Sequence, residues 1–487
     1  MTALSASAPR HWPAWIAGTA WNQGTPAEVT HPGDGSLVGT YSVPDAAAVE
    51  AAVEAAWSVR KIAQATTAAQ RAAALTHVSR RLEERLDEVA ALITAENGKP
   101  ITWARAEASR AVSTFRWAAE EARRFNGEFQ RLDTEATTAG RAAIIRRFPH
   151  GPVLGISPFN FPVNLVAHKV APAIAVGAPI VIKSAPATPL GALLLGELLA
   201  ETDLAAGMFS VLPVGNEIAP SLVEDPRMPV VSFTGSETVG FAIQRAVPHK
   251  HVVLELGGNA AAIVLADYSS DDDIEWACQR IAMFGNSQGG QTCVSVQRIL
   301  VEESIADRFT ARLTEVVRNL PNGSPWEPAT VVGPMIHEAA AERVEEWLTE
   351  AIDAGATVLV GGKRVGTYVE PTLLAQVPGN VRVETEEVFG PVMSIRTIAD
   401  LDEGIAIVND SRFGLQTGVF THDIQKAFRA HRDLEVGGVI IGEAPTFRAD
   451  QMPYGGIKAS GVGREGLRSA IMDLTHERVL VLTDLAL

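Results

Sequence analysis

Short apolar segments alternate with helical segments through the middle of this chain. Between residues 153 and 258 the apolar runs are VLGIS, PIVIKSA, FSVLPV, PVVSFTG and HVVLELGG, and helical sequences such as SETVGFAIQRA separate several of them. A second alternating block, from about residue 271 to residue 442, contains QRILV, ATVLVGG, VMSIRTI, TGVFT and GGVIIG. Strands joined by crossover helices form parallel sheets that are buried on both faces. The sequence therefore predicts a two-lobed α/β chain.

Other segments flank these blocks. Residues 45 to 127 are dense in alanine and repeat apolar positions at three and four, which predicts helices. Residues 142 to 153, AAIIRRFPHGPV, read as a strand, and so does the tail VLVLTDLAL, which no helical segment follows. An exposed strand edge is usually paired with another strand. We expect the tail to join a subunit interface.

Charge and cysteine content exclude several classes of protein. The 487 residues carry 41 Lys and Arg against 57 Asp and Glu, a formal charge of −16, which disfavours a nucleic-acid partner. The two cysteines, Cys278 and Cys293, make no disulfide framework and no CxxC metal site, so no metal is predicted. The first 18 residues show no leader pattern, and the apolar run between Lys169 and Lys183 is too short and too broken to span a bilayer. We expect a cytoplasmic protein without a membrane partner.

Cys293 stands in the polar, glycine-rich segment GGQTC, where its thiol could serve as a nucleophile or as a small buried group. Cys278, within an apolar helical pattern, fits the buried role. Glu255 interrupts the apolar run VLELGGN, and a carboxyl in such a place is either a general base with a raised pKa or part of a structural hydrogen bond. Asn160, in the turn PFNFP, could donate to an oxyanion or cap its own turn.

The segment FTGSETVG predicts a strand that ends at Gly235 and a helix that begins at Ser236, with Gly240 in its first turn. Backbone N–H groups at such a turn can bind phosphate, although an ordinary strand-to-helix turn has the same appearance. Each of these motifs is weak when taken alone.

In this order, PFNFP, VIKSA, FTGSETVG, LELGGN, GGQTC, EEVFGPV and MPYGGIKASGVGREG make the sequence resemble the NAD(P)-dependent aldehyde dehydrogenase superfamily from about residue 15 onward. The resemblance implies two Rossmann-type α/β lobes and a small β oligomerisation arm. The cofactor-binding domain would comprise residues 1–128 and 150–256, the catalytic domain 257–470, and the arm 129–149 and 471–487. A homodimer or homotetramer is implied.

The family's catalytic roles are carried over to four matching residues. The resemblance implies that Cys293 attacks an aldehyde, that Asn160 and the Cys293 N–H stabilise the oxyanion, and that Glu255 activates water to hydrolyse the thioester. Glu465, in GVGREG, matches a carboxylate associated with proton relay. The product would be a carboxylic acid.

NAD or NADP is the implied cofactor. The residues matched to its site are Lys183, Ser184 and Pro186 at the adenosine ribose, Gly235, Ser236 and Gly240 at the phosphates, and Glu387 and Phe389 at the nicotinamide ribose and ring. The family's usual glutamate, which holds the ribose 2′-hydroxyl, is replaced here by Pro186. A proline does not repel a 2′-phosphate, so NADP use is open.

Two further departures bear on the site. The spacing from Glu255 to Cys293 is 293 − 255 = 38 residues, a few more than is common in the family, and we expect residues 269–273, SSDDD, to be looped out on the surface. Gly442 and Glu443 stand where many members carry asparagine, which predicts a changed pocket rim.

The substrate is less constrained. Arg448 and Arg110 match segments near the family's substrate mouth and tunnel, and Phe161 lies beside Asn160; either arginine could bind an anionic group or form an ordinary ion pair. We expect a short anionic or hydroxylated aldehyde. The alternatives are a broad-range aliphatic aldehyde dehydrogenase, a CoA-acylating enzyme and a thiol esterase without cofactor.

Overall fold

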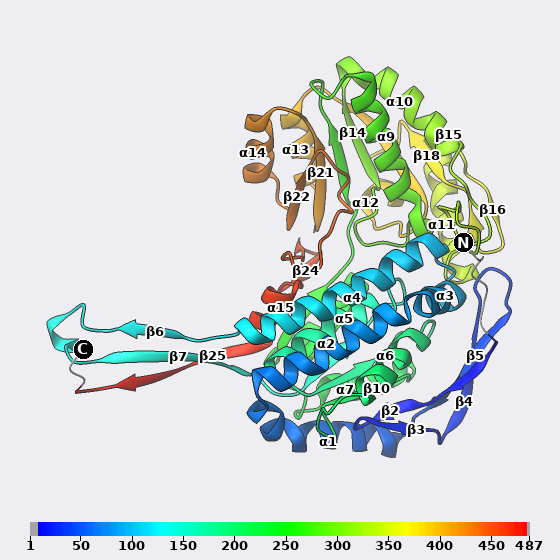
Figure 1. Ribbon diagram of the computed structural model, residues 1–487. Helices are drawn as coiled ribbons and strands as arrows, with labels where there is room; N and C mark the ends of the chain where they lie inside the picture. The colour runs from blue at the N-terminus through cyan, green and yellow to red at the C-terminus, as the bar shows by residue number, and fades with distance from the viewer. Residues whose placement is uncertain (1–7, 485–487) are drawn as a thin grey trace.

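The computed structural model describes residues 8–484, and Figure 1 shows two α/β lobes with a long β arm extending from one of them. The first seven residues, within the segment that shows no leader pattern, and the last three of the expected tail strand lie outside the described residues. Mixed α/β architecture with parallel sheets confirms the predicted fold class. No helix of residues 8–484 is long and apolar enough to cross a membrane.

The first lobe is built on an eight-stranded sheet of order β24-β12-β11-β8-β9-β10-β2-β3. Its strands are β2 (Ala14–Ile16), β3 (Thr19–Trp21), β8 (Val153–Ile156), β9 (Ile180–Lys183), β10 (Phe209–Leu212), β11 (Val230–Thr234), β12 (His251–Glu255) and β24 (Gly461–Val462). Its helices are α1 (Ala46–Ala65), α2 (Ala68–Glu84), α3 (Leu86–Asn97), α4 (Ile101–Arg124), α5 (Asn164–Val176), α6 (Leu190–Ala200), α7 (Ala219–Glu224), α8 (Glu237–Ala246) and α15 (Leu467–Asp473).

The second lobe has a seven-stranded sheet of order β15-β18-β19-β14-β13-β21-β22. Its strands are β13 (Ala261–Val264), β14 (Arg298–Glu302), β15 (Thr357–Val360), β18 (Thr372–Ala375), β19 (Val392–Ile398), β21 (Gln416–Phe420) and β22 (Gly438–Ile441). Its helices are α9 (Asp271–Asn286), α10 (Glu303–Arg318), α11 (Glu338–Asp353), α12 (Arg382–Thr385), α13 (Leu401–Asn409) and α14 (Ile424–Asp433).

The arm is a three-stranded antiparallel sheet that projects away from both lobes (Figure 1). It consists of β6 (Glu128–Arg131), β7 (Ala142–Pro149) and β25 (Thr475–Leu482). The pairing of β7 with β25 runs from Ala142 opposite Leu482 to Pro149 opposite Thr475. The arm presents exposed Phe129, Val479, Leu480 and Val481, so its apolar side chains lack a cover within this chain.

Smaller elements complete the chain. They are β1 (Arg10–Trp12), β4 (Thr25–Thr30) and β5 (Leu37–Val43) in one sheet, the pairs β16 (Arg364–Val365) with β17 (Tyr368–Val369) and β20 (Phe413–Gly414) with β23 (Ile457–Lys458), and the 3₁₀ turns η1 (Ala136–Thr138), η2 (Asn216–Ile218) and η3 (Ser287–Gly290).

The parallel register of the first sheet determines where the polar side chains meet. Ile156 at the end of β8 pairs with Lys183 at the end of β9, and Thr234 at the end of β11 pairs with Glu255 at the end of β12. The carboxyl ends of adjacent parallel strands form one edge, which is where ligands bind in open α/β sheets. Large apolar clusters on both faces of the sheet hold the strands in this register.

One segment differs from expectation. Residues 269–273 are not looped out, because Ser270 caps α9 through a capping box with Asp273 and the three aspartates form the helix's first turn. Carboxylates in the first turn interact favourably with the positive end of the helix dipole and so stabilise the helix. The chain returns to the first sheet near its end: β24 pairs with β12, and α15 packs against α5. The predicted division into domains stays a prediction.

Candidate active site

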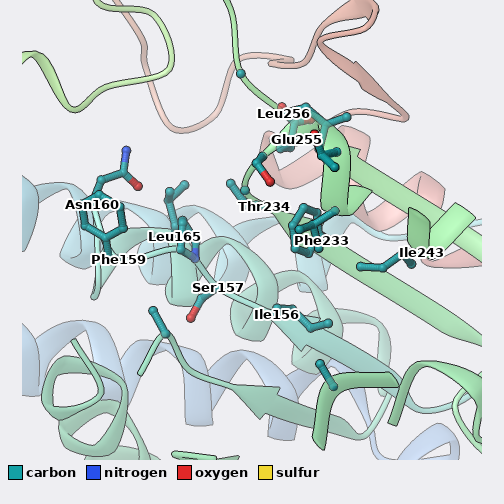
Figure 2. Close-up of a pocket in the computed structure, with 18 of the residues that line it drawn as sticks. Ile156, Ser157, Phe159, Asn160, Leu165, Phe233, Thr234, Ile243, Glu255 and Leu256 are labelled. Atoms are coloured by element: carbon teal, nitrogen blue, oxygen red, sulfur yellow. The ribbon is translucent and has the colours of Figure 1, made fainter. Parts of the chain in front are cut away.

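One cavity of about 870 Å³ joins the edge of the first sheet to the loop before β14. Its walls come from the turn after β8, from β9, from the β11–α8 turn, from β12, and from the Cys293, Glu387 and Arg448 segments of the second half of the chain. Figure 2 shows Asn160, Thr234 and Glu255 around this cavity. The sequence-predicted residues that line it are Cys293, Glu255, Asn160, Glu465, Lys183, Pro186, Gly235, Ser236, Glu387, Phe389 and Arg448.

Cys293 is half-buried, and its Sγ lies 3.0 Å from the hydroxyl of Tyr454. Burial raises the pKa of the thiol to about 12, and the hydrogen bond from Tyr454 opposes that rise. Three consecutive left-handed residues, Gln288, Gly289 and Gly290, with φ of +57°, +63° and +67°, turn the chain shortly before the cysteine. Backbone strain of this kind clusters at functional sites. Cys278, by contrast, is fully buried in the second lobe, as predicted.

Glu255 is 4% exposed, and neither of its carboxyl oxygens has a hydrogen-bond partner among the described residues. Burial, and next the charge of Glu465, raise its pKa well above the usual range. A buried carboxyl without a partner is costly, so its presence beside a cavity needs an explanation. A raised pKa makes the ionised form a strong base near neutral pH.

Glu465 has the opposite environment. Arg448 donates to its Oε2 at 3.0 Å, and the Lys169 ammonium lies 3.7 Å from its Oε1. Burial works against ionisation of Glu465, but the two cations outweigh it and lower its pKa. Glu465 therefore stays ionised, whereas Glu255, with its raised pKa, keeps its proton to higher pH. Two carboxyls whose pKa values are shifted apart are typical of acid–base sites.

The Arg448 side chain is 8% exposed, and not all of its donors are paired. Its guanidinium pairs with Glu465 and lies 3.9 Å above the Tyr454 ring, yet its buried Nε has no hydrogen-bond partner among residues 8–484. Nη2 also lies 3.3 Å from Nε2 of His168. A buried donor without a hydrogen-bond partner is costly, and Arg448 also lines the cavity.

Asn160 lies on the turn after β8, where its Nδ2 donates to the carbonyl of Gln291 at 2.9 Å. Gln288 Nε2 donates to the Asn160 carbonyl and to Asn97 Oδ1. These bonds tie the Asn160 turn to the Cys293 loop. An Asn amide carries two N–H donors, so one remains available to the cavity.

Lys183 and Pro186 line the far part of the cavity. The Lys183 ammonium donates to Asn216 Oδ1 at 2.9 Å, and burial lowers its pKa to about 8 against the pull of Glu217. Pro186 provides no charge here. Ser184 does not line the cavity; it is buried behind Lys183, and its hydroxyl has no partner among the described residues.

The β11–α8 turn has the geometry of an anion site. Ser236 caps α8 without a side-chain hydrogen bond, so the first amides of the helix are not satisfied by their own cap. Gly235 donates its N–H to the Glu255 carbonyl at 3.0 Å. Gly240 lies outside the lining: a Cβ there would stand 2.4 Å from Leu256, so this glycine permits α8 to pack closely on the chain that follows β12.

Glu387 and Phe389 approach from the second lobe. The Gly258 N–H donates to Glu387 Oε1 at 3.2 Å, and burial raises the pKa of this carboxyl to about 7. Phe389 adopts φ of +47° and meets Phe159 edge to face, with ring centroids 5.8 Å apart. Such a backbone conformation is rare for a bulky residue.

Arg110 and Phe161 are not among the residues that line the cavity. Arg110 is ion-paired with Asp450 at 2.9 Å, and Phe161 packs under Lys99, whose ammonium lies 3.8 Å from the ring centroid. Asp450 also accepts from His168, so Arg110 is linked to Arg448 through a polar chain. Gly442 and Glu443, the two residues expected at the pocket rim, are not among those that line the cavity, and Glu443 pairs with Arg280 at 2.7 Å.

Three lining or supporting residues escaped the sequence analysis: Tyr454, Lys169 and Arg343. Tyr454 stands within the quoted MPYGG motif, and Lys169 is a charged residue in an apolar helix, so a signal existed for both. Arg343, which donates to the Val388 carbonyl at 2.7 Å, has a helical surface pattern and no distinguishing signal.

The residues present fit NAD or NADP. The cavity is long enough to run from Lys183 to Cys293, it offers an uncapped helix start at Ser236, and it presents a carboxyl at Glu387. A dinucleotide needs a cationic or neutral pocket for its first ribose and amide donors for its phosphates. It also needs a group that accepts hydrogen bonds from the hydroxyls of its second ribose.

Comparison with known proteins gives the family directly. Residues 18–480 match the model of the aldehyde dehydrogenase family. The chain is 43% identical over 402 residues to 3-sulfolactaldehyde dehydrogenase of Priestia aryabhattai, covering 82% of this chain and 83% of that protein.

Two solved structures are close matches. Aldehyde dehydrogenase 21 from Physcomitrella patens, in complex with the reaction product succinate, superposes with a TM-score of 0.96 at 40% identity, covering 99% of this chain and 100% of that one. NADP-dependent glyceraldehyde-3-phosphate dehydrogenase from Bacillus halodurans C-125, complexed with NADP, gives 0.92 at 34% identity, with coverage of 97% and 99%. The chain belongs to the aldehyde dehydrogenase family and is an oxidoreductase that uses NAD or NADP.

Proposed function

We propose that this enzyme oxidises a short aldehyde with an anionic group at its far end, and that Cys293 is the nucleophile. The observation that carries the proposal is the cavity itself, which brings Cys293, Asn160 and Glu255 together with the unsatisfied Nε of buried Arg448. The chemistry needs the first three, and the fourth selects the substrate.

In the first half-reaction the half-buried Cys293 thiol gives its proton to solvent water, and the resulting thiolate attacks the carbonyl carbon. The carbonyl π electrons move to oxygen, and Asn160 Nδ2 with the Cys293 N–H donates to the resulting oxyanion. Preorganised donors of this kind contribute roughly 10²–10³-fold each. NAD or NADP, when bound, supplies the two-electron acceptor that converts the thiohemiacetal to a thioester.

In the second half-reaction Glu255 accepts a proton from water as the water oxygen attacks the thioester carbon. The carbon–sulfur bond breaks, the Cys293 thiolate leaves, and the carboxylic acid is released. The unpaired oxygens of Glu255 support this role because nothing else among the described residues occupies them. Glu465, ionised beside Arg448 and Lys169, acts on the charge of Glu255 and serves the proton relay.

We propose that the cofactor lies along the part of the cavity bounded by the first sheet. Lys183 and Pro186 would hold the adenosine ribose, with Ser184 buried behind Lys183. The Gly235–Ser236 turn would hold the phosphates, with Gly240 keeping the helix close, and Glu387 and Phe389 would hold the nicotinamide ribose and ring. Cationic Lys183 and neutral Pro186 leave room for a 2′-phosphate, so both NAD and NADP are accepted.

The relatives support an anionic substrate. A sulfonate, a carboxylate and a phosphate occur in the compounds for which the three similar proteins are named or with which one is complexed. Arg448 suits all three, since a guanidinium binds oxyanions through several donors. We propose Arg110 and Phe161 as supports of the outer end of the substrate mouth, Arg110 acting through Asp450 and His168.

The test is a panel of aldehydes in matched neutral and anionic pairs of equal length, assayed with NAD and with NADP. The anionic member should have the higher kcat/KM, and Arg448→Gln should lower that preference by roughly ten- to a hundredfold, the value of a charge-assisted hydrogen bond. Arg280→Gln, a surface arginine paired with Glu443, is the matched control and should change nothing.

Equal rates for both members of each pair would overturn the substrate class and favour a broad-range aliphatic aldehyde dehydrogenase. Acyl-CoA as product would identify a CoA-acylating enzyme. Ester hydrolysis without any cofactor reduction would identify a thiol esterase.

We also propose a cytoplasmic homodimer or homotetramer that assembles through the arm. The exposed apolar residues of β25 support this, because monomers rarely leave a long apolar strand uncovered. Light scattering should give a mass of two or four chains, and Leu480→Lys should lower it. A monomer at micromolar concentration would refute the arm's role.

A further inference from the structure

The hydroxyl of Tyr454 has a single hydrogen-bond partner among the described residues, and that partner is the sulfur of Cys293, 3.0 Å away. Tyr454 is 4% exposed. A buried phenol usually finds a partner. Here the partner is the sulfur of Cys293, the atom proposed to react with the aldehyde.

A second contact acts on the other side of the phenol. The guanidinium carbon of Arg448 lies 3.9 Å from the centroid of the Tyr454 ring. A cation over an aromatic face withdraws electron density from the ring, which makes the hydroxyl a better hydrogen-bond donor. Tyr454 therefore contacts both other residues: its hydroxyl meets the Cys293 sulfur, and its ring face meets the Arg448 guanidinium.

Protonation of the sulfur changes what this contact is worth. When Cys293 is a thiol, either atom can donate. When it is a thiolate, only the Tyr454 O–H can donate, and the bond becomes charge-assisted and about twice as strong. The contact therefore favours the thiolate over the thiol.

The environment otherwise opposes the thiolate. Burial of Cys293 is the largest cause of its raised pKa, and the charges of Glu387 and Glu255 add to it. The Tyr454 hydrogen bond is the strongest opposing influence, and the charge of Arg448 is the next. Among the groups of residues 8–484 that act on this sulfur, Tyr454 does most to restore the nucleophilic form.

We propose that Tyr454 is a further catalytic residue, whose hydroxyl donates a hydrogen bond to the Cys293 sulfur, stabilises the thiolate and keeps it in place before the aldehyde arrives. The inference rests on the proposed role of Cys293 as nucleophile. It adds a residue to which the sequence analysis assigned no part.

The direct test is the pH dependence of Cys293 alkylation by iodoacetamide in the free enzyme, with the modified peptide located by mass spectrometry. Tyr454→Phe removes the hydroxyl and keeps the ring under Arg448. The apparent pKa of Cys293 should rise by about one to two units, and alkylation at a fixed pH below that pKa should slow by roughly ten- to a hundredfold.

Tyr268→Phe is the matched control, because Tyr268 is also buried but stacks on His422 in the second lobe, outside the cavity. Its alkylation profile should equal that of the unaltered enzyme. A Tyr454→Phe profile that also equals it would overturn the proposal, since a role confined to packing would change thermal stability and leave the profile in place.

A second variant keeps the hydroxyl and so protects the test against a misfolded Tyr454→Phe protein. Site-specific 3-fluorotyrosine at position 454 is a stronger donor, and it should move the Cys293 profile to lower pH. No shift, or a shift to higher pH, would contradict the proposal. Because neither aldehyde nor cofactor is present, failure of the proposed substrate class would not affect this result.

Discussion

Replacement of Glu255 by glutamine separates the two half-reactions. The change keeps the size of the side chain and breaks no hydrogen bond of the described structure, because both carboxyl oxygens lack partners. The first half-reaction, which needs Cys293 and Asn160, should keep its rate within about threefold, since no described contact of either residue involves Glu255. Hydrolysis of the thioester should fall by roughly 10²–10⁴-fold, the usual contribution of a general base.

Stopped-flow absorbance of the reduced cofactor measures both quantities. The Glu255→Gln enzyme should give a burst of one equivalent per active site, followed by a slow steady state. In the unaltered enzyme the steady-state rate should rise with pH, because the pKa of Glu255 is raised and its basic form accumulates only as pH increases through that value. The variant should lose this rise.

The control is Glu275→Gln, a same-size change on α9 whose carboxylate binds Arg312 at the surface. It should behave as the unaltered enzyme does. A Glu255→Gln enzyme with full steady-state rate would refute the assignment of Glu255 as the base, and a missing burst would show that Glu255 acts before the thioester forms.

Three further outcomes are expected. Cys293→Ala should abolish oxidation and leave cofactor binding intact, as titration of protein fluorescence with NADPH would show; turnover by a clean variant would refute the nucleophile. Pro186→Glu should place a carboxylate near the adenosine ribose and lower kcat/KM with NADP at least tenfold relative to NAD, and an unchanged ratio would move the ribose pocket elsewhere. The Lys183 ammonium, with its pKa lowered to about 8, is charged below that pH and loses its charge above it, so kcat/KM with NADP should fall relative to NAD as pH rises from 7 to 9; a constant ratio would exclude Lys183 as the phosphate ligand.

Local patterns in the sequence predicted the lobes well. The strands that end at Ile156, Lys183, Thr234 and Glu255 read as strands because each is a short, largely buried run of a parallel sheet. The β7–β25 pairing was implied by the family resemblance, and the sequence alone indicated only that the uncovered tail strand would need a partner. Helix α5 was harder to recognise, since Pro172 lies inside it; the helix continues around the proline because every one of its residues is buried against the first sheet and its neighbours.

Contacts between distant segments could not be read from local patterns. The motif order brought Cys293, Asn160 and Glu255 to one site by resemblance, but nothing near Tyr454 in sequence indicates that its hydroxyl meets a sulfur 161 residues away. The same holds for the opposite pKa shifts of the two carboxyls: burial and the charge of Glu465 raise the pKa of Glu255, whereas Arg448 and Lys169 lower the pKa of Glu465.

The return of the C-terminal segment to the first sheet, through β24 beside β12, has a consequence for biosynthesis. Tyr454, Arg448 and Glu465 are all translated after both lobes' other strands, and Tyr454 follows Cys293 by 161 residues. At a synthesis rate of about 5–20 residues per second, the cysteine waits roughly 8–30 s on the ribosome without its partner. Until the last strands leave the ribosome and dock, the nascent chain carries Cys293 without its Tyr454 hydrogen bond, and the site is complete only after that step.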